Sequence, residues 1–199
     1  MFNFRTDMAI ERNDIYKQRN NIQEIDGIEV KEETKQNIKI SRVMVKNENG
    51  EKAIGKPQGI YTTIDIDKMK AITDERIEVI ANIVGDELRP IIGKHITEIE
   101  DILVVGLGNI YVTPDALGPK VVPEIEVTRH ILQYLPKLMP EDTRPVSAIS
   151  PGVLGITGIE TMEILKGIVD NIKPKMLIVI DALATKNIER ISSSIQIAD

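Results

Sequence analysis

The sequence contains no cysteine and no tryptophan, and it has only two histidines among 199 residues. The lack of cysteine excludes disulfide bonds, thiol catalysis and cysteine-ligated zinc sites; it fits a cytosolic protein but is also compatible with other compartments. Aromatic residues make up 3% of the chain, too few for stacking platforms that bind nucleobases. No apolar run approaches the length of a membrane span, and the amino terminus lacks the apolar core of a signal peptide. We therefore expect no membrane partner.

Charge and size narrow the possibilities further. The formal net charge is −6 and the isoelectric point is near 5.1, which argues against a nucleic-acid partner. Hydrophobic residues make up 42% of the chain and charged residues 28%, the balance of a globular protein with a core. A chain of 199 residues is enough for one domain and short for two.

From residue 74 onward, segments with helical periodicity alternate with short apolar runs. This order, with short connections, predicts a mainly parallel sheet between layers of helices. The predicted helices are 74–93, 114 to about 135 (continuing past Pro123), 159–171 and a short one over 184–190; the predicted strands are 101–106, 145–149, 175–180 and 194–197.

The first third of the chain has a different pattern. Residues 38–44 alternate between apolar and polar, residues 47–50 resemble a turn, and residues 59–66 resemble a returning strand. Residues 1–35 have no sustained period. The predicted fold class is α/β: a three-layer sandwich with a mainly parallel central sheet plus an antiparallel N-terminal hairpin. Because the sequence stops directly after an apolar strand, we expect it to be truncated at its carboxyl end.

The chain is organised around the stretch from Asp101 to Pro119. A valine-rich strand leads into Gly106-Leu107-Gly108, where glycine allows backbone angles that other residues resist. Thr113 is then predicted to cap a helix whose first residue is Pro114, and this places Asp115 just beyond the end of a strand. The two glycines also suggest a dinucleotide-binding loop, but Tyr111 occupies the position of its third glycine and the helix begins late.

A second aspartate, Asp181, directly follows the predicted strand 175–180. Taken singly, Asp115 is most simply a residue that complements a helix dipole, and Asp181 a turn residue. If their strands are adjacent and parallel, both carboxylates lie at one edge of the sheet, where α/β proteins bind ligands. Such a pair can activate a water and protonate an amine leaving group, or hold a divalent metal together with a histidine.

The remaining polar candidates are weaker. His95 and His130 have no partner at a metal-binding spacing, so we interpret both as surface or packing residues. The segment 151–158 contains Gly152 and Gly155 and is either a substrate-contacting loop or a tight packing turn.

Six stretches of the sequence together resemble the germination proteases of spore-forming bacteria, which degrade small acid-soluble spore proteins. They are Arg5-Thr6-Asp7, Val105-Gly106-Leu107-Gly108-Asn109, Val112-Thr113-Pro114-Asp115-Ala116-Leu117-Gly118-Pro119, Arg144-Pro145-Val146-Ser147-Ala148-Ile149, Pro151-Gly152-Val153-Leu154-Gly155-Ile156-Thr157-Gly158-Ile159-Glu160-Thr161 and Ile180-Asp181-Ala182-Leu183-Ala184.

The resemblance implies an endopeptidase of an atypical aspartic type whose catalytic residues are Asp115 and Asp181. It implies no cofactor and no metal, and a fold similar to that of the hydrogenase-maturating endopeptidases, which have a related Gly-x-Gly-Asn loop. The candidates for a substrate-binding loop are Gly106, Gly108, Asn109, Gly152 and Gly155.

The resemblance also implies a tetrameric zymogen that removes its own propeptide, in the cytoplasm of the spore core. Its substrates are cut after an acidic residue and before an apolar residue followed by alanine, which Asp7-Met8-Ala9 matches. We therefore expect residues 1–7 to be a propeptide that covers the active site, and residues 8–199 to be one peptidase domain. The family chain runs beyond Asp199, so some of its strands are absent here.

Two alternatives remain at this point. One is a metal-dependent peptidase of the hydrogenase-maturation type that uses the same two aspartates. The other is a non-catalytic α/β module that binds a nucleotide or a peptide.

Overall fold

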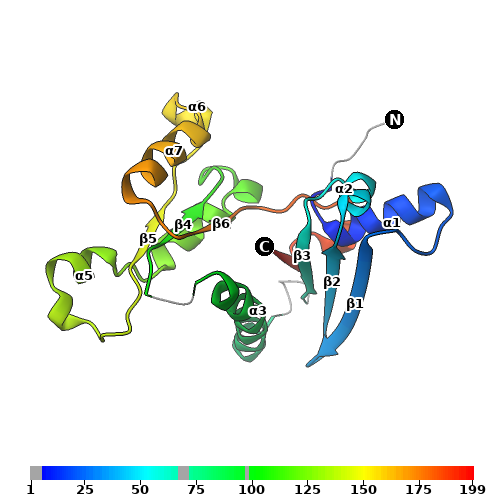
Figure 1. Ribbon diagram of the computed structural model, residues 1–199, viewed down its shortest axis with the longest axis horizontal. Helices are drawn as coiled ribbons and strands as arrows, with labels where there is room; N and C mark the ends of the chain where they lie inside the picture. The colour runs from blue at the N-terminus through cyan, green and yellow to red at the C-terminus, as the bar shows by residue number, and fades with distance from the viewer. Residues whose placement is uncertain (1–5, 67–71, 97–98) are drawn as a thin grey trace. The chain divides into compact units, whose positions relative to one another are not determined.

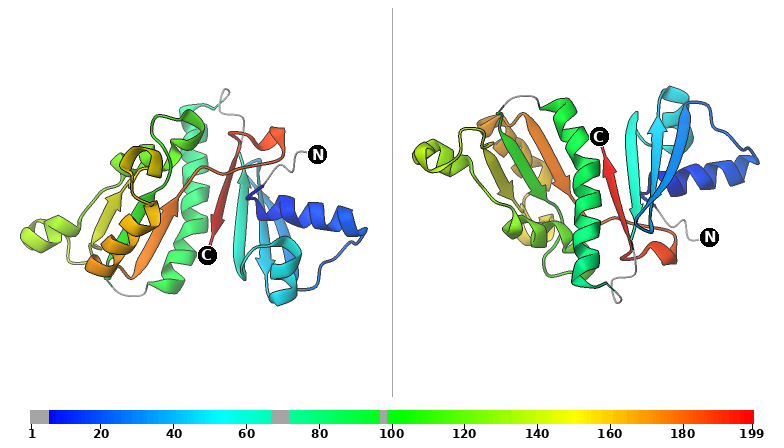
Figure 2. Two further views of the ribbon diagram at one scale, coloured as in Figure 1. Left: turned by 90° about the horizontal axis from the view of Figure 1, so that it is seen from above. Right: turned by 90° about the horizontal axis from the view of Figure 1, so that it is seen from below.

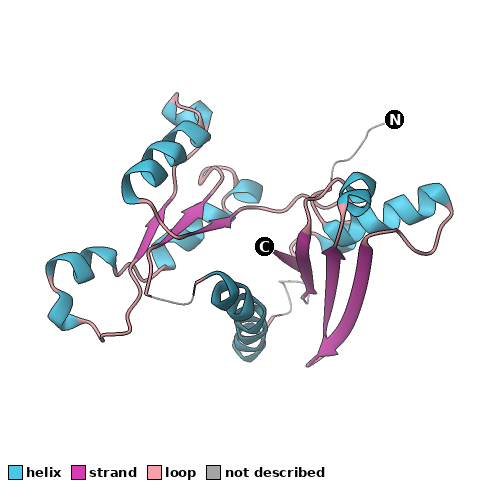
Figure 3. Ribbon diagram, in the orientation of Figure 1, coloured by secondary structure: helices cyan, strands magenta, loops and turns pink. Residues whose placement is uncertain are grey.

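The computed structural model describes residues 6–66, 72–96 and 99–199 and has a mixed α/β fold (Figure 3). The chain divides into two compact units. One comprises the residues up to Ile91 together with Leu183–Asp199, and the other comprises Ile92–Ala182. Each unit contains its own sheet, antiparallel in the first and parallel in the second, so the predicted fold class is confirmed. The prediction of a single peptidase domain over residues 8–199 stays a prediction.

The sheet of the first unit has four antiparallel strands in the order β1-β2-β3-β7. The predicted hairpin is its centre, formed by β2 (Ile38–Val45) and β3 (Gly59–Asp65). Two further strands, β1 (Ile28–Lys35) and β7 (Ser194–Ala198), extend it on either side. The hairpin prediction is therefore confirmed, but its sheet is larger than predicted.

Alternation along the strands gives this sheet two apolar faces. Ile38 and Ile40 of β2 lie on the face that packs against α3 (Asp74–His95), together with Ile64 and Ile197. Val43 and Val45 lie on the opposite face, in a cluster with the residues that begin α1 (Ala9–Asn20). Figure 1 shows α1 and α2 (Glu48–Ile54) beside strands β1 to β3. The first unit therefore has helices on both faces of its sheet.

Three elements of this unit, α1, β1 and α2, were not predicted because their local sequence is polar. Helix α1 contains few apolar residues, and its stability comes from burying Ala9 and Ile10 against the sheet. The predicted turn at residues 47–50 is instead the start of α2 (Glu48–Ile54). Asn47 caps this helix, since its Oδ1 accepts the Gly50 N–H at 2.9 Å.

An ion pair joins α3 to the sheet. The Arg42 guanidinium of β2 donates to both Glu87 carboxylate oxygens, at 2.9 Å from Nε and 2.5 Å from Nη2, and also to Glu33 at 2.6 Å. The Glu87 side chain is only 9% exposed. These carboxylates raise the pKa of Arg42 above its ordinary value. Because bidentate pairing fixes direction as well as distance, it sets the rotation of α3 on the sheet.

The sheet of the second unit has three parallel strands in the order β5-β4-β6. Strand β4 (Ile102–Gly106) is buried throughout and lies between β5 (Val146–Ile149) and β6 (Met176–Ile180). Helix α7 (Thr161–Ile172) packs on one face through Leu165, which contacts the cluster of Leu103 and Val105. Figure 2 gives two further views of these strands and of α7. The predicted parallel sheet is confirmed.

The predicted long helix from residue 114 to about 135 is wrong. The structure breaks it into short pieces, and the reason is proline, which removes an N–H donor and clashes with the preceding turn. Pro123 lies in the short turn Val122–Glu124, and the backbone is extended at Ile125, directly after this turn. The pieces are η2 (Thr113–Asp115), α4 (Leu117–Val121), η3 (Val122–Glu124), α5 (Arg129–Tyr134) and η4 (Pro136–Leu138).

Three smaller differences concern helix ends and loops. Thr113 does not cap a helix: Val112 precedes η2, and no side-chain cap is formed. The glycine-rich segment contains a short helix, α6 (Leu154–Thr157). The predicted helix over 184–190 is only one turn, η5 (Ile188–Arg190). Within the described residues, no helix is both long and apolar enough to cross a membrane.

Two glycines let the chain after β4 lie directly on the strand ends. A Cβ atom on Gly118 would lie 2.4 Å from the Leu107 carbonyl oxygen and 2.5 Å from the Ile180 carbonyl oxygen. A Cβ atom on Gly106 would lie 2.2 Å from the carbonyl oxygen of Gly118 itself. The Leu107 N–H donates to the Ile180 carbonyl oxygen at 2.8 Å, joining the ends of β4 and β6. The start of α4 is therefore held against the carboxyl edge of the sheet.

Replacing Arg42 with alanine should lower the free energy of unfolding by about 1.5–3 kcal/mol, since Glu87 is left buried without its charged donor. Urea unfolding measures this change. Lys52→Ala is the control, because the Lys52–Glu48 pair is 75% and 78% exposed and should contribute less than about 0.5 kcal/mol. Equal effects of the two substitutions would contradict the assigned role of Arg42.

Replacing Gly118 with alanine should also destabilise the protein, by about 1–3 kcal/mol, because the new methyl group meets backbone atoms that cannot move aside. The matched control is Gly167→Ala in α7, where a Cβ atom has no neighbour within 4 Å. In a helix interior this control should raise stability by about 0.5–1 kcal/mol. Thermal and urea unfolding of both variants check the opposite signs; a neutral Gly118→Ala would rule out the close packing.

Candidate active site

The two candidate aspartates lie at the same edge of the parallel sheet. Strands β4 and β6 are direct neighbours, and their register pairs Gly106 with Ile180. Asp181 directly follows Ile180, and Asp115 belongs to the short turn η2 that leads into α4. Because parallel strands end at a common edge, both residues are placed where α/β folds bind ligands. Their catalytic role is still a prediction.

The loop that carries Asp115 closes on itself through hydrogen bonds. The Asn109 N–H donates to Oδ2 of Asp115 at 2.9 Å and to its carbonyl oxygen at 3.0 Å. Gly108 has a φ of +118°, and a Cβ atom there would lie 2.0 Å from the Asp115 carbonyl oxygen. The glycine thus allows the loop to fold back onto Asp115. The carboxylate is half-buried, with one oxygen oriented by its own loop.

Asp181 is more open. Its side chain is exposed, and its Oδ1 accepts the N–H of Ala182 at 2.7 Å. The pair therefore combines one half-buried, loop-held carboxylate with one that water reaches easily.

The other loop candidates differ in how tightly they are packed. Gly106 and Gly108 lie against backbone atoms, as described above, and Asn109 also uses its Oδ1 to accept the Tyr111 N–H at 3.0 Å. Gly152 has a φ of +77°, and its carbonyl oxygen accepts the Thr161 hydroxyl at 3.1 Å. A Cβ atom on Gly155 would have no neighbour within 4 Å. Contact of these residues with substrate is still a prediction.

The two histidines are both exposed side chains on helices. His95 is exposed at the end of α3, and His130 is exposed on α5. Across residues 6–66, 72–96 and 99–199, no three histidine, aspartate or glutamate side chains are grouped so that they could hold a metal ion. Among these residues, the two aspartates therefore have no third carboxylate or imidazole grouped with them.

The predicted cleavage site lies in the first unit. Most of the predicted propeptide, residues 1–5, is outside the described residues. The Asp7 N–H donates to the Ala184 carbonyl oxygen at 2.8 Å, and the Asp7 carbonyl oxygen accepts Nε2 of Gln196 at 3.3 Å. Met8 is fully buried. The Asp7–Met8 bond is thus held inside the folded unit, and a protease could reach it only after local opening.

Sequence reasoning missed one residue that shapes this site. Gly118 was noted only as part of a motif, but it is the residue that brings α4 onto the ends of β4 and β6. The Leu117-Gly118-Pro119 sequence gave no periodicity or spacing that marks a close backbone approach. Only the carbonyl groups of Leu107 and Ile180, which lie far apart in sequence, reveal why no side chain fits there.

Comparisons with known proteins agree with one another. A family model described as germination protease matches residues 5–199. The germination protease of Caldanaerobacter subterraneus subsp. tengcongensis is 48% identical over 199 residues, covering 98% of this chain and 58% of the relative. Germination proteases of Clostridium perfringens and Priestia megaterium are 46% and 43% identical and cover 100% of this chain.

The chain spans 55–61% of the length of these relatives. Identity of 43–48% over 98–100% of the chain, together with a family model that matches nearly all of it, establishes homology. The chain belongs to the germination protease family.

Proposed function

We propose that the protein is an endopeptidase that begins the degradation of small acid-soluble spore proteins during spore germination. The observation that carries this proposal is the pairing of β4 with β6, which puts Asp115 and Asp181 at one edge of the sheet. Family membership supports the same reaction. The substrate is a polypeptide cut after an acidic residue and before an apolar residue followed by alanine.

In the proposed mechanism the two carboxylates divide the work of peptide hydrolysis. One takes a proton from a water that attacks the peptide carbonyl, and the other protonates the departing amine. The Asn109 N–H holds one oxygen of Asp115, so this side chain has a defined orientation. The exposed Asp181 meets water directly. The aspartic type of the enzyme is part of the proposal.

The proposal extends to how the enzyme is made and where it acts. Residues 1–7 form a propeptide, and the protein removes it by cutting between Asp7 and Met8. The protein is a homotetramer in the cytoplasm of the spore core. The hydrogen bonds of Asp7 to Ala184 and Gln196 support a stable precursor, since they hold the cleavage site within the fold until that site opens.

Replacing either candidate aspartate with asparagine should reduce kcat by about 10²–10⁴-fold, because the new side chain cannot transfer a proton. The assay follows cleavage of a purified small acid-soluble spore protein by the full-length protein. Asp170→Asn, at an exposed position of α7, is the matched control and should keep full activity.

The same assay, repeated with and without a chelator, distinguishes the proposed mechanism from its alternatives. Full activity of both aspartate variants would overturn the proposal in favour of a binding module or of other catalytic residues. Activity that is lost in a chelator and restored by a divalent metal would replace the aspartic mechanism with a metallopeptidase. Activity that survives the chelator supports the carboxylate pair.

Replacing Asp7 with alanine should slow removal of the amino-terminal segment by at least about tenfold, because the acidic residue before the cut is part of the recognised sequence. Mass spectrometry of the purified precursor over time measures the fraction that begins at Met8. Asp14→Ala, an acid further along α1, is the control and should be processed at the normal rate. Unchanged processing of Asp7→Ala would exclude this cleavage site.

A further inference from the structure

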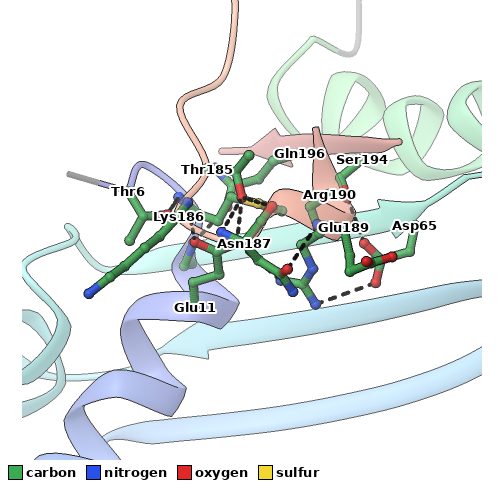
Figure 4. Close-up of polar contacts among 12 residues, drawn as sticks. Thr6, Glu11, Asp65, Thr185, Lys186, Asn187, Glu189, Arg190, Ser194 and Gln196 are labelled. Carbon is green, nitrogen blue, oxygen red and sulfur yellow. Dashed lines mark hydrogen bonds and ion pairs between the residues drawn. The ribbon is translucent and has the colours of Figure 1, made fainter. Parts of the chain in front are cut away.

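A buried carboxylate at the start of α1 holds the segment that follows β6. Glu11 is 8% exposed and accepts three hydrogen bonds from this segment: from the Thr185 hydroxyl at 2.6 Å, the Lys186 N–H at 2.9 Å and the Asn187 N–H at 3.3 Å. Figure 4 shows these contacts, with the Arg190 guanidinium beside them. Arg190 lies 3.9 Å from Glu11 and 3.5 Å from Asp65.

Hydrogen bonding outweighs burial at this carboxylate. Burial alone would raise the pKa of Glu11, but the hydroxyl groups of Thr185 and Thr6 and the N–H groups of Lys186 and Asn187 lower it below its ordinary value. Glu11 is therefore a buried anion that is satisfied by hydrogen bonds, mostly to neutral groups. Such a site also favours a cation that can take the place of one of these neutral donors.

Thr6 connects Glu11 to the predicted cleavage site. Its hydroxyl oxygen accepts the Met8 N–H at 3.2 Å, and the same hydroxyl lowers the pKa of Glu11. Met8 is the N-cap residue of α1 and Glu11 the third residue of the helix. At these two positions a glutamate side chain can reach back to the N-cap nitrogen directly, as in a capping box. In the intact chain the Met8 N–H donates to the Thr6 hydroxyl instead.

Hydrolysis of the Asp7–Met8 bond changes this arrangement in a defined way. One water is consumed, the Asp7 carbonyl becomes a carboxylate, and the Met8 nitrogen becomes an ammonium group at neutral pH. Thr6 leaves the folded unit as part of the released segment, residues 1–7. The nitrogen that donated to Thr6 is now a cation at the N-cap of the helix whose third residue is the buried Glu11, and the Thr6 hydroxyl that lowered the pKa of Glu11 is gone.

We propose that the new amino terminus of Met8 replaces Thr6 and forms an ion pair with Glu11. This inference rests on the proposed cleavage between Asp7 and Met8. The pair ties the cut end of the chain to the carboxylate that holds residues 185–187.

The segment held in this way follows Asp181 closely. Ile180 is anchored within its own unit by the Leu107 N–H, and Leu183 packs into the apolar cluster around Met8. Only Asp181 and Ala182 lie between these two anchored residues. Cleavage removes one support of this segment, the bond from the Asp7 N–H to the Ala184 carbonyl oxygen. The ion pair at Glu11 supplies another, so processing exchanges a neutral contact for a charged one in the segment that follows Asp181 in the chain.

The test measures the pKa of the Met8 α-amino group in a chain whose first residue is Met8, released from a cleavable fusion. Nuclear magnetic resonance of the labelled amino group gives the titration directly. An ordinary α-amino group has a pKa of about 7.7–8.0, and the ion pair should raise it by at least about one unit. Glu11→Gln should abolish this rise. Glu48→Gln, which removes an exposed acid at the start of α2, should leave it unchanged.

Equal pKa values with and without Glu11 would overturn the proposal. If Glu11→Gln fails to fold, a second measurement tests the same ion pair without a substitution. Nα-acetylation of the chain that begins at Met8 removes the charge of the amino group and keeps every side chain. Hydrogen exchange of the Lys186 and Asn187 amides should then become several-fold faster, and an unchanged rate would also overturn the proposal. Neither measurement requires catalysis. Unchanged processing of Asp7→Ala would refute the cleavage site, and active aspartate variants would refute the mechanism, without deciding the ion pair.

Discussion

The arrangement of the second unit depends on the hydrogen bonds that join β4 to β5 on one side and to β6 on the other. Its pairing with β6 sets Gly106 beside Ile180, and the Leu107 N–H continues the ladder to the Ile180 carbonyl oxygen. This register fixes where Asp181 leaves the sheet. It also creates the surface on which Gly118 rests, since both carbonyl groups that approach Gly118 belong to residues joined by that ladder. A shift of one residue in this pairing would move the two aspartates apart and turn the apolar residues of β6 to the other face.

The parts of the fold that could be predicted are those in which periodicity and burial coincide. Strand β4 is buried at every position, so an unbroken apolar run was sufficient to identify it. Helix α3 has an apolar stripe that packs on one face of a sheet, and both its ends were close to the prediction. The placement of Asp115 and Asp181 at one edge of the sheet followed from the parallel alternation of strands and helices. These inferences needed only local patterns and one general rule of α/β topology.

The elements that escaped prediction are stabilised by distant residues. The amino-terminal half of α1 buries two charged or polar side chains, Glu11 and Asn13, and the partners of Glu11 lie more than 170 positions away in the chain. A polar helix start of this kind has no periodicity to detect. The broken helix after Asp115 failed for the opposite reason: its apolar spacing was present, but prolines prevented a continuous helix. Periodicity failed to detect α1 because distant contacts stabilise that helix. It wrongly predicted a continuous helix after Asp115 because prolines break the chain there.

The position of β7 has a consequence for how the protein emerges from the ribosome. This strand pairs with β3, so residues near 61–65 are joined to residues near 194–198. All of the second unit, residues 92–182, is synthesised between them. The parallel sheet can therefore form while the antiparallel sheet still has an open edge along β3, and loop closure over this long separation makes the pairing of β3 with β7 slow. An exposed strand edge is the part of a nascent chain most prone to pair with other molecules, so β3 is most vulnerable until the five residues of β7 have been added.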